Sequence, residues 1–243
     1  LNHPQFYPLQ MNGIPLISSF LTSSSLKFNR DYAQDTLYYF QYKADFQPAD
    51  PPTGIAQSAV SRLLMDSVFI STQEVSLLQN HFYFIQSDTL SLEGLTLFMG
   101  PKHYPDMKLM DELISPLTYF TSRSELDEIR NAKDPKIAFE NFWLNIHISP
   151  EAAGAAIRSY YRAVKKANEL FTSYKEGWKT DRDMVYIIFG NPDRVFRDNK
   201  KEFWLYGDIR FEYKIISNLF APKMYVLLRD KGYEKIWIKK ITD

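Results

Sequence analysis

Residues 27–122 carry the alternation of apolar and polar positions that is typical of β-strands. The segment "DTLYYFQYKADF" is rich in aromatic residues, and the proline-rich "QPADPPTG" ends it. The segments "AVSRLLMDSVFIS", "HFYFIQSD" and "SLEGLTLFMG" follow at roughly the 8–12-residue spacing of a sandwich. We therefore predict an antiparallel β-sandwich domain over residues 27–122. Residues 1–26 have scattered prolines, a serine cluster and no clear period, so we predict an extended N-terminal arm with room for one strand.

Residues 123–243 change to a helical pattern and then return to a strand pattern. The segment "TSRSELDEIRNA" opens with a Ser-x-x-Glu-like capping pattern, and Asp134-Pro135 and Ser149-Pro150 are good helix starts. The apolar positions keep helical spacing throughout "SPEAAGAAIRSYYRAVKKANELFTSY". After these helices, "EFWLYGD", "IRFEYKII", "KMYVLLRD" and "EKIWIKKIT" have the character of strands in a closing meander. We predict an α+β domain, helices followed by a small antiparallel sheet, so the whole chain has a mixed fold.

Composition narrows the range of functions. With 243 residues, of which 45% are hydrophobic and 24% charged, the chain is a globular protein of one large domain or two ordinary ones. No apolar run reaches the ~18 residues that a membrane-spanning helix needs. The formal net charge of zero argues against a dedicated nucleic-acid binder. The absence of cysteine excludes disulfides and thiolate chemistry, and with 16% aromatic residues it favours an extracytoplasmic protein.

The segment "GWKTD", residues 177–181, combines a helix stop with a helix start. Gly177 suits the left-handed conformation that ends a helix, so Trp178 is free to fold back onto the preceding helices. Thr180 and Asp181 are both good N-cap residues, and we expect Asp181 to accept bonds from the amides of the next turn. We interpret this segment as a corner between two helices.

The following residues, "RDMVYIIFGNPD", predict a short helix over residues 182–189. Gly190 would close this helix, and Pro192 would stop it. The β-branched content of "VYII" leaves a buried strand as the alternative. Asp193 lies where a cap or turn prefers aspartate, so we expect a structural role for it.

These residues resemble the GWxTD domain family, which is found mainly in bacteria with an outer membrane. The pentapeptide "GWKTD" looks like the family signature, and "DRDMVYIIFGNPDRV" and "EFWLY" also fit its pattern. The preceding "YYRAVKKANELF" is similar to the family's helix, with matching residues at Arg162, Ala167, Asn168 and Phe171. Members usually have glycine where Asp183 stands here. The resemblance covers about residues 123–243 and implies a protein of the bacterial envelope.

A second likeness is to the small outer-membrane lipoproteins of β-barrel assembly (the SmpA/OmlA type). Those proteins have a helix pair followed by a short antiparallel sheet, and they act by contacting protein partners. The residues that carry this likeness are Asp181, Val185, Gly190, Pro192, Trp204 and Tyr206.

Candidate chemistry rests on the carboxylates Asp181, Asp193 and Glu202. A glycoside hydrolase needs two carboxyl groups with separated pKa values, about 5–9 Å apart. We expect capping to be the role of Asp181 and Asp193, with acid–base chemistry as the alternative. The four histidines lie far apart without metal-ligand spacing, and no phosphate-loop, dinucleotide-binding or nucleophile-elbow pattern occurs. We expect no catalytic residue, no metal and no cofactor.

Two further hypotheses concern arginine and tryptophan side chains. Arg162 lies in the middle of the long predicted helix, where its guanidinium could form a fork with the carboxylate of Asp181 and pin the helix to the corner. The four tryptophans fit core packing, a protein interface or a sugar-stacking platform. We take three of them as candidates for an interface: Trp143, Trp204 and Trp237.

Together these features predict a non-enzymatic cell-envelope protein. We expect a structural or accessory subunit of an outer-membrane-associated multi-protein complex for assembly, secretion or transport, with protein partners and no nucleic acid. The chain begins at Leu1, for which a cleaved signal peptide is one explanation, and a lipid anchor upstream would place the protein in the periplasm or at the outer membrane. The alternatives are an envelope hydrolase acting on glycan or peptide near the GWxTD turn, and a carbohydrate-binding module.

Overall fold

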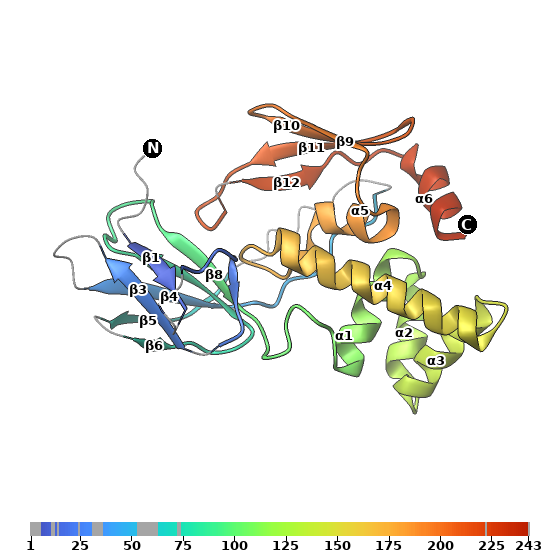
Figure 1. The fold of residues 1–243 in the computed structure, drawn as a ribbon, viewed down its shortest axis with the longest axis horizontal. Helices are drawn as coiled ribbons and strands as arrows, with labels where there is room; N and C mark the ends of the chain where they lie inside the picture. Colours follow the sequence, from blue (N-terminus) through green and yellow to red (C-terminus); the bar gives the residue numbers. More distant parts are fainter. Residues whose placement is uncertain are drawn as a thin grey trace.

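The chain folds into a β-rich N-terminal half and a C-terminal half of helices and one sheet (Figure 1). The computed structural model describes residues 6–10, 13, 15–23, 25–30, 36–52, 63–71, 74–221 and 223–242. In Figure 1 the long helix α4 (Pro150–Phe171) begins at the end of the molecule opposite the β-rich half and runs toward that half. The order of strands, then helices, then a small antiparallel sheet confirms the predicted mixed fold.

Two sheets pack face to face in the N-terminal half. One has the strand order β2-β8-β7-β4-β5 and the other β1-β3-β6. The strands are β1 Phe6–Leu9, β2 Phe20–Leu21, β3 Ser25–Arg30, β4 Leu37–Lys43, β5 Met65–Ser71, β6 Val75–Ser76, β7 His81–Gln86 and β8 Leu95–Met99. Their pairing is antiparallel except between β2 and β8, which run parallel. Leu26 of the smaller sheet and Tyr39 and Tyr83 of the larger one share a buried cluster, as alternate positions of paired sheets should.

The residues of the predicted arm take part in this sandwich. β1 pairs with β3, and β2 pairs with β8. The side chain of Leu21 is buried in the cluster between the sheets. Burial of this apolar side chain stabilises the arm within the sandwich. Residues 1–5, 11, 12, 14 and 24 of the arm lie outside the described residues, as do residues 59–62 of the segment predicted to form a strand.

The second face of the larger sheet packs against the C-terminal half. Phe82 and Phe98 are almost fully buried there, in a cluster with Phe46 and Tyr104. Tyr174 and Phe220, both from the C-terminal half, contact Phe82 edge to face at 5.9 and 5.3 Å between ring centroids. The strands β7 and β8 are therefore covered on both faces, and the two halves share apolar contacts.

The helices begin where capping side chains are available. They are α1 Met110–Ile114, the 3-10 helix η1 Ser115–Tyr119, α2 Arg123–Asn131, α3 Pro135–Asn145 and α4 Pro150–Phe171. Ser122, Asp134 and Ser149 each accept a bond from an amide of the first turn, which confirms the predicted starts. The helical part begins at Met110, before the predicted boundary at residue 123.

The remaining elements are the 3-10 helix η2 Gly177–Lys179, the helix α5 Asp181–Phe189, a sheet and a last helix, α6 Tyr233–Thr242. The sheet has the order β12-β11-β10-β9, with strands β9 Arg194–Arg197, β10 Lys201–Tyr206, β11 Ile209–Ile216 and β12 Met224–Leu227. The helix α5 confirms the prediction over residues 182–189. The prediction of a strand at "EKIWIKKIT" is wrong: Tyr233 and Trp237, one helical turn apart, both pack on the core, so this segment buries a helical face.

Candidate functional site

Gly177 lies directly against the preceding helix. The helix α4 ends at Phe171, six residues before Gly177, and Thr172 is its C-cap residue. A Cβ atom on Gly177 would lie 2.5 Å from the carbonyl oxygen of Ala167 and 2.6 Å from Cα of Asn168. Gly177 is not among the described glycines with positive φ, so the predicted left-handed helix end is wrong. Glycine is needed here because two stretches of backbone approach each other too closely for any side chain.

Trp178 is bonded to two helices through its backbone. Its amide donates to Oδ1 of Asn168 at 3.0 Å, and its carbonyl accepts from the hydroxyl of Tyr119 at 2.6 Å. Asn168 is fully buried, and its Nδ2 donates to the carbonyl of Pro105 at 3.0 Å. The indole of Trp178 is buried beside the ring of Tyr119. These bonds connect η2, α4, η1 and the loop at residue 105.

Thr180 caps the next helix and also binds an unusual carboxyl group. Its hydroxyl accepts the amide of Asp183 at 3.3 Å and donates to Oδ2 of Asp183 at 2.7 Å. Asp183 is fully buried, and its Oδ1 has no hydrogen-bond partner among the described residues. Burial raises the pKa of the Asp183 carboxyl well above its usual range. This is the position at which the sequence departs from the glycine usual in the resembling family.

Asp181 binds a strand that lies 46 residues later in the chain. Its Oδ2 accepts the amide of Leu227 in β12 at 2.8 Å. The guanidinium of Arg229 donates to both carboxylate oxygens, at 2.7 Å to Oδ1 and 3.3 Å to Oδ2. Arg229 also donates to the carbonyls of Asp50 and Pro51, each at 3.0 Å. Asp181 therefore joins α5 to β12 and, through Arg229, to a segment of the N-terminal half.

The proposed fork between Arg162 and Asp181 is wrong, as is the expectation that Asp181 caps α5. The guanidinium bound to Asp181 belongs to Arg229, whereas Arg162 is exposed on α4. Thr180 takes the capping position, and this leaves the carboxylate of Asp181 to point toward β12.

Gly190, Pro192 and Asp193 form the turn from α5 into the sheet. Gly190 has φ +76° and its amide donates to the carbonyl of Tyr186 at 2.8 Å, which ends the helix as the sequence indicates. The backbone amide of Asp193 donates to Leu205 of β10 at 2.8 Å, and its Oδ2 accepts the amide of Gly207 at 2.7 Å. Asp193 thus holds the start of β9 against the turn between β10 and β11.

A family model for the GWxTD domain matches residues 81–243, which is more than half of the chain. The chain belongs to the GWxTD domain family. The match starts at His81, the first residue of β7, and so covers part of the sandwich. It is therefore longer than the resemblance seen in the sequence, which covers about residues 123–243. No curated protein and no solved structure matches the chain. The likeness to the SmpA/OmlA-type lipoproteins stays a prediction.

The predicted carboxylates of this GWxTD domain are each occupied by donors of the same chain. Glu202 is fully buried, where Oε1 accepts from the indole of Trp204 at 2.8 Å and Oε2 is bound by Arg197. Asp181 is bound by Arg229 and β12, and Asp193 lies in an exposed turn. Each carboxylate thus binds neighbouring donors of its own chain. Among the described residues no group of three or more histidines and carboxylates could hold a metal ion.

The tryptophans predicted as interface residues are buried inside the GWxTD domain. Trp143, Trp204 and Trp237 are only 3–7% exposed. Trp143 packs among the helices, while Trp204 and Trp237 pack in the core between α5 and the sheet. Trp237 also donates its indole N–H to the carbonyl of Tyr119 at 2.8 Å. Their burial confirms core packing, the first of the roles considered for the tryptophans, and does not support the interface role for which these three were candidates.

Several residues of the GWxTD corner lack a local signal in the sequence. Gly177 donates its amide to Oγ1 of Thr172 at 3.1 Å and to the hydroxyl of Tyr104 at 3.3 Å. Arg229 lies 48 residues after Asp181, and Tyr119 lies 59 residues before Trp178. The run "LLRD" at the end of β12 contains Arg229, but nothing in it indicates a partner 48 residues away.

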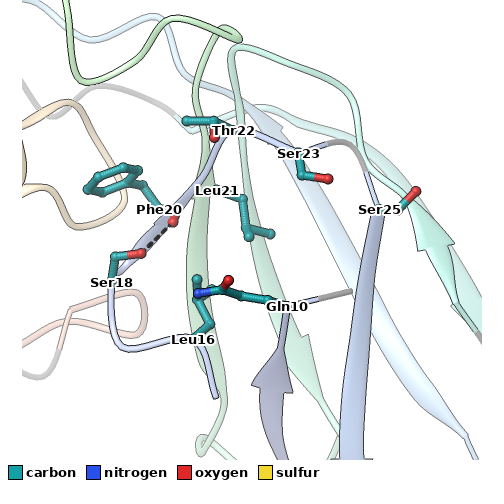
Figure 2. Close-up of a pocket in the computed structure, with 8 residues that line it drawn as sticks. All are labelled: Gln10, Leu16, Ser18, Phe20, Leu21, Thr22, Ser23 and Ser25. Atoms are coloured by element: carbon teal, nitrogen blue, oxygen red, sulfur yellow. Dashed lines mark hydrogen bonds between the residues drawn. The ribbon is translucent and has the colours of Figure 1, made fainter. Parts of the chain in front are cut away.

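A hollow of about 440 Å³ lies on the sandwich at the strand β2 (Figure 2). Hydroxyl groups, one amide and one aromatic ring line it, and Ser18 donates its hydroxyl to the carbonyl of Phe20 at 2.7 Å. The lining residues are Gln10, Leu16, Ser18, Phe20, Leu21, Thr22, Ser23 and Ser25. None of the site residues expected from the sequence lies in it.

Proposed function

We propose that this GWxTD domain protein is a non-enzymatic accessory subunit of a multi-protein complex at the outer membrane. The observation that carries the proposal is the bonding of the motif itself. Each polar group of "GWKTD" described above binds another element of the same chain, as the amide of Trp178 and the carboxylate of Asp181 illustrate. The motif then serves as a joint that presents the rest of the surface in a fixed arrangement, which is what a scaffold subunit needs.

The competing proposal, an envelope hydrolase, has less support in the geometry. Hydrolysis by two carboxyl groups needs both to face one substrate, with one of them protonated and the other ionised. Asp181 and Glu202 are each bound by an arginine and a further N–H donor. The buried carboxyl with a raised pKa, Asp183, is fully enclosed and so has no contact with solvent.

A carbohydrate-binding module needs exposed rings that share a plane. Among the described residues the strongly exposed aromatic side chains are Tyr7 in β1 and Phe196 in β9. These strands belong to different sheets, so the two rings form no common platform. The observation that would favour the carbohydrate proposal is thus missing from the described part of the chain.

The proposed location is the periplasm or the outer membrane. The cysteine-free composition supports it, and so does the resemblance to the GWxTD family, which implies a protein of the bacterial envelope. A signal peptide and a lipid anchor upstream of Leu1 belong to the same proposal. Among the described residues no helix has both the length and the apolar content to cross a membrane.

The proposal is tested by fractionation and purification from the native cell. We expect the tagged protein in the outer-membrane fraction, and we expect one partner to co-purify in constant ratio after cross-linking. Recovery from the cytoplasm as a lone chain would contradict the proposal. A parallel assay on envelope glycans and peptides addresses the enzyme alternative. Turnover that disappears in Asp193→Asn, with the fold intact by circular dichroism, would overturn the non-enzymatic assignment.

A further inference from the structure

The sheet of β9, β10, β11 and β12 has one covered face and one open face. Trp204, Phe211 and Tyr213 point to the covered face and are buried in the core with residues of α4 and α5. In Figure 1 the sheet lies at the top of the molecule, with α5 and α4 beneath it. Alternate residues of a strand point to opposite faces, so Phe203 of β10 belongs to the open face. Phe203 is half-buried, and Phe196 of β9 is 52% exposed.

Apolar side chains occupy the centre of this open face. Phe203 lies directly opposite Phe196 on the neighbouring strand, so the two rings share the face. Leu205, two residues after Phe203 in β10, points to the same side and is half-buried. The guanidinium of Arg210 in β11 lies 5.4 Å from the centroid of the Phe203 ring. Two aromatic rings and a leucine thus form an apolar centre that water reaches in part.

Positive charges surround the apolar centre. The positions of β9, β10 and β11 that share the open face hold four cations, Arg194, Lys201, Arg210 and Lys214. They hold one carboxylate, Glu212, which is bound by Lys201 and lies 3.8 Å from Arg210. The face therefore carries an excess of three positive charges, whereas the whole chain has a formal net charge of zero.

We propose that this open face is the docking surface for an acidic segment of a partner protein. The partner would place an apolar side chain against the rings of Phe196 and Phe203, and carboxylates against the surrounding cations. Arginine suits this role because its guanidinium binds a carboxylate through two parallel N–H donors. The inference rests on the proposed function, because it names the chemistry of the partner that an accessory subunit requires.

The layout of the face favours a polypeptide over other anionic ligands. An apolar centre rich in aromatic residues and a charged rim with arginines are the usual anatomy of a protein interface. A single-stranded nucleic acid carries a phosphate at every nucleotide and is held by a groove of continuous positive charge. Here the carboxylate of Glu212 lies directly opposite Phe203, in the middle of the face, and would repel such a backbone. Complementary charge also speeds the encounter with an acidic segment.

The first experiment identifies what lies on the face in the native cell. A photoreactive phenylalanine analogue, p-benzoylphenylalanine, replaces Phe196 in the full chain. The control has the analogue at Leu90, a 94% exposed residue in the loop after β7. We expect an adduct from position 196 alone, and mass spectrometry should show that the linked peptide has more acidic than basic residues and an apolar side chain. No adduct, or an adduct with a basic segment, a nucleic acid, a lipid or a second copy of this chain, would overturn the proposal.

The second experiment separates the docking surface from the proposed function. The variants Arg210→Glu and Phe196→Ser should each lower the amount of co-purified partner at least about tenfold. Arg123→Glu, at an exposed residue of α2, is the charge-reversal control and should leave it unchanged. Circular dichroism shows that each variant keeps its fold, and each should remain in the outer-membrane fraction. Partner retained by the folded Arg210→Glu and Phe196→Ser variants would overturn the docking surface alone. A wild-type chain without any partner would contradict the proposed function as well.

Discussion

Replacing Asp181 with alanine tests whether the GWxTD corner is a joint. The change removes both oxygens that bind Arg229 and the acceptor of the Leu227 amide. The side chains of Asp181 and Arg229 are 12% and 5% exposed, so the pair lies inside the protein. Arg229 would keep only backbone carbonyls as acceptors, at Asp50, Pro51 and Leu227. Removing one partner of a buried ion pair costs ~3–5 kcal/mol, because the other charge stays buried.

A loss of this size should lower the melting temperature by roughly 6–20 °C, at roughly 2–4 °C per kcal/mol for a chain of this length. Asp181→Asn keeps an oxygen for the Leu227 amide and loses only the charge, so its effect should be smaller. The measurement is thermal and urea unfolding followed by circular dichroism. Arg162→Ala is the matched control: Arg162 is exposed on α4, and its removal should change stability by less than ~0.5 kcal/mol.

A double-mutant cycle with Arg229→Met isolates the ion pair. The combined loss should be clearly smaller than the sum of the two single losses, because Arg229 and Asp181 bind each other. Additive losses would refute the reasoning. An effect of Arg162→Ala as large as that of Asp181→Ala would refute it too, because the exposed arginine would then have to support the corner.

Three further changes test the packing and charge of the corner. Gly177→Ala should cost ~1–3 kcal/mol in urea unfolding, since its Cβ would meet backbone at 2.5 Å. Gly154→Ala, where the nearest atom is an arginine tip at 3.3 Å, should instead stabilise the helix by ~0.5–1 kcal/mol; equal effects would contradict the close approach. Asn168→Leu leaves the amide of Trp178 and the carbonyl of Pro105 without their partner, and each should cost ~1–3 kcal/mol in the same assay. Burial raises the pKa of Asp183 in the folded protein. The protonated carboxyl therefore contributes fully to the free energy of unfolding below the unfolded pKa of about 4, and this contribution is lost as pH rises toward the folded pKa. The melting temperature of Asp183→Asn relative to wild type should therefore increase with pH, and a constant difference would contradict burial as the cause.

Local signals in the sequence account for most element starts in the described chain. Ser122, Asp134 and Ser149 cap their helices as predicted, because a capping bond involves residues only two or three positions apart. The strands β4, β7 and β8 fall within predicted segments, because alternation reflects which face is buried. Gly190 ends α5 for an equally local reason, a positive φ.

The misassigned features depend on contacts between distant residues. The segment at 233–242 contains β-branched residues that fit a strand, yet Tyr233 and Trp237 need a helix to reach the core together. Gly177 looks like a helix end, but the crowding at Ala167 that requires glycine becomes visible only when the chain folds back. The partner of Asp181 lies 48 residues away, and no spacing rule indicates it.

The residues of the GWxTD motif are consecutive in sequence, yet their bonds are directed toward different elements of the fold. Gly177 meets the backbone of α4, Trp178 is bonded to α4 and η1, Thr180 caps α5, and Asp181 binds β12 and Arg229. A catalytic constellation brings groups from separate segments to one reacting atom. Here neighbouring residues diverge toward separate elements, an arrangement that fixes a junction. Loss of a single bond should therefore reduce stability by an amount set by that bond, and it should leave the other connections of the junction in place.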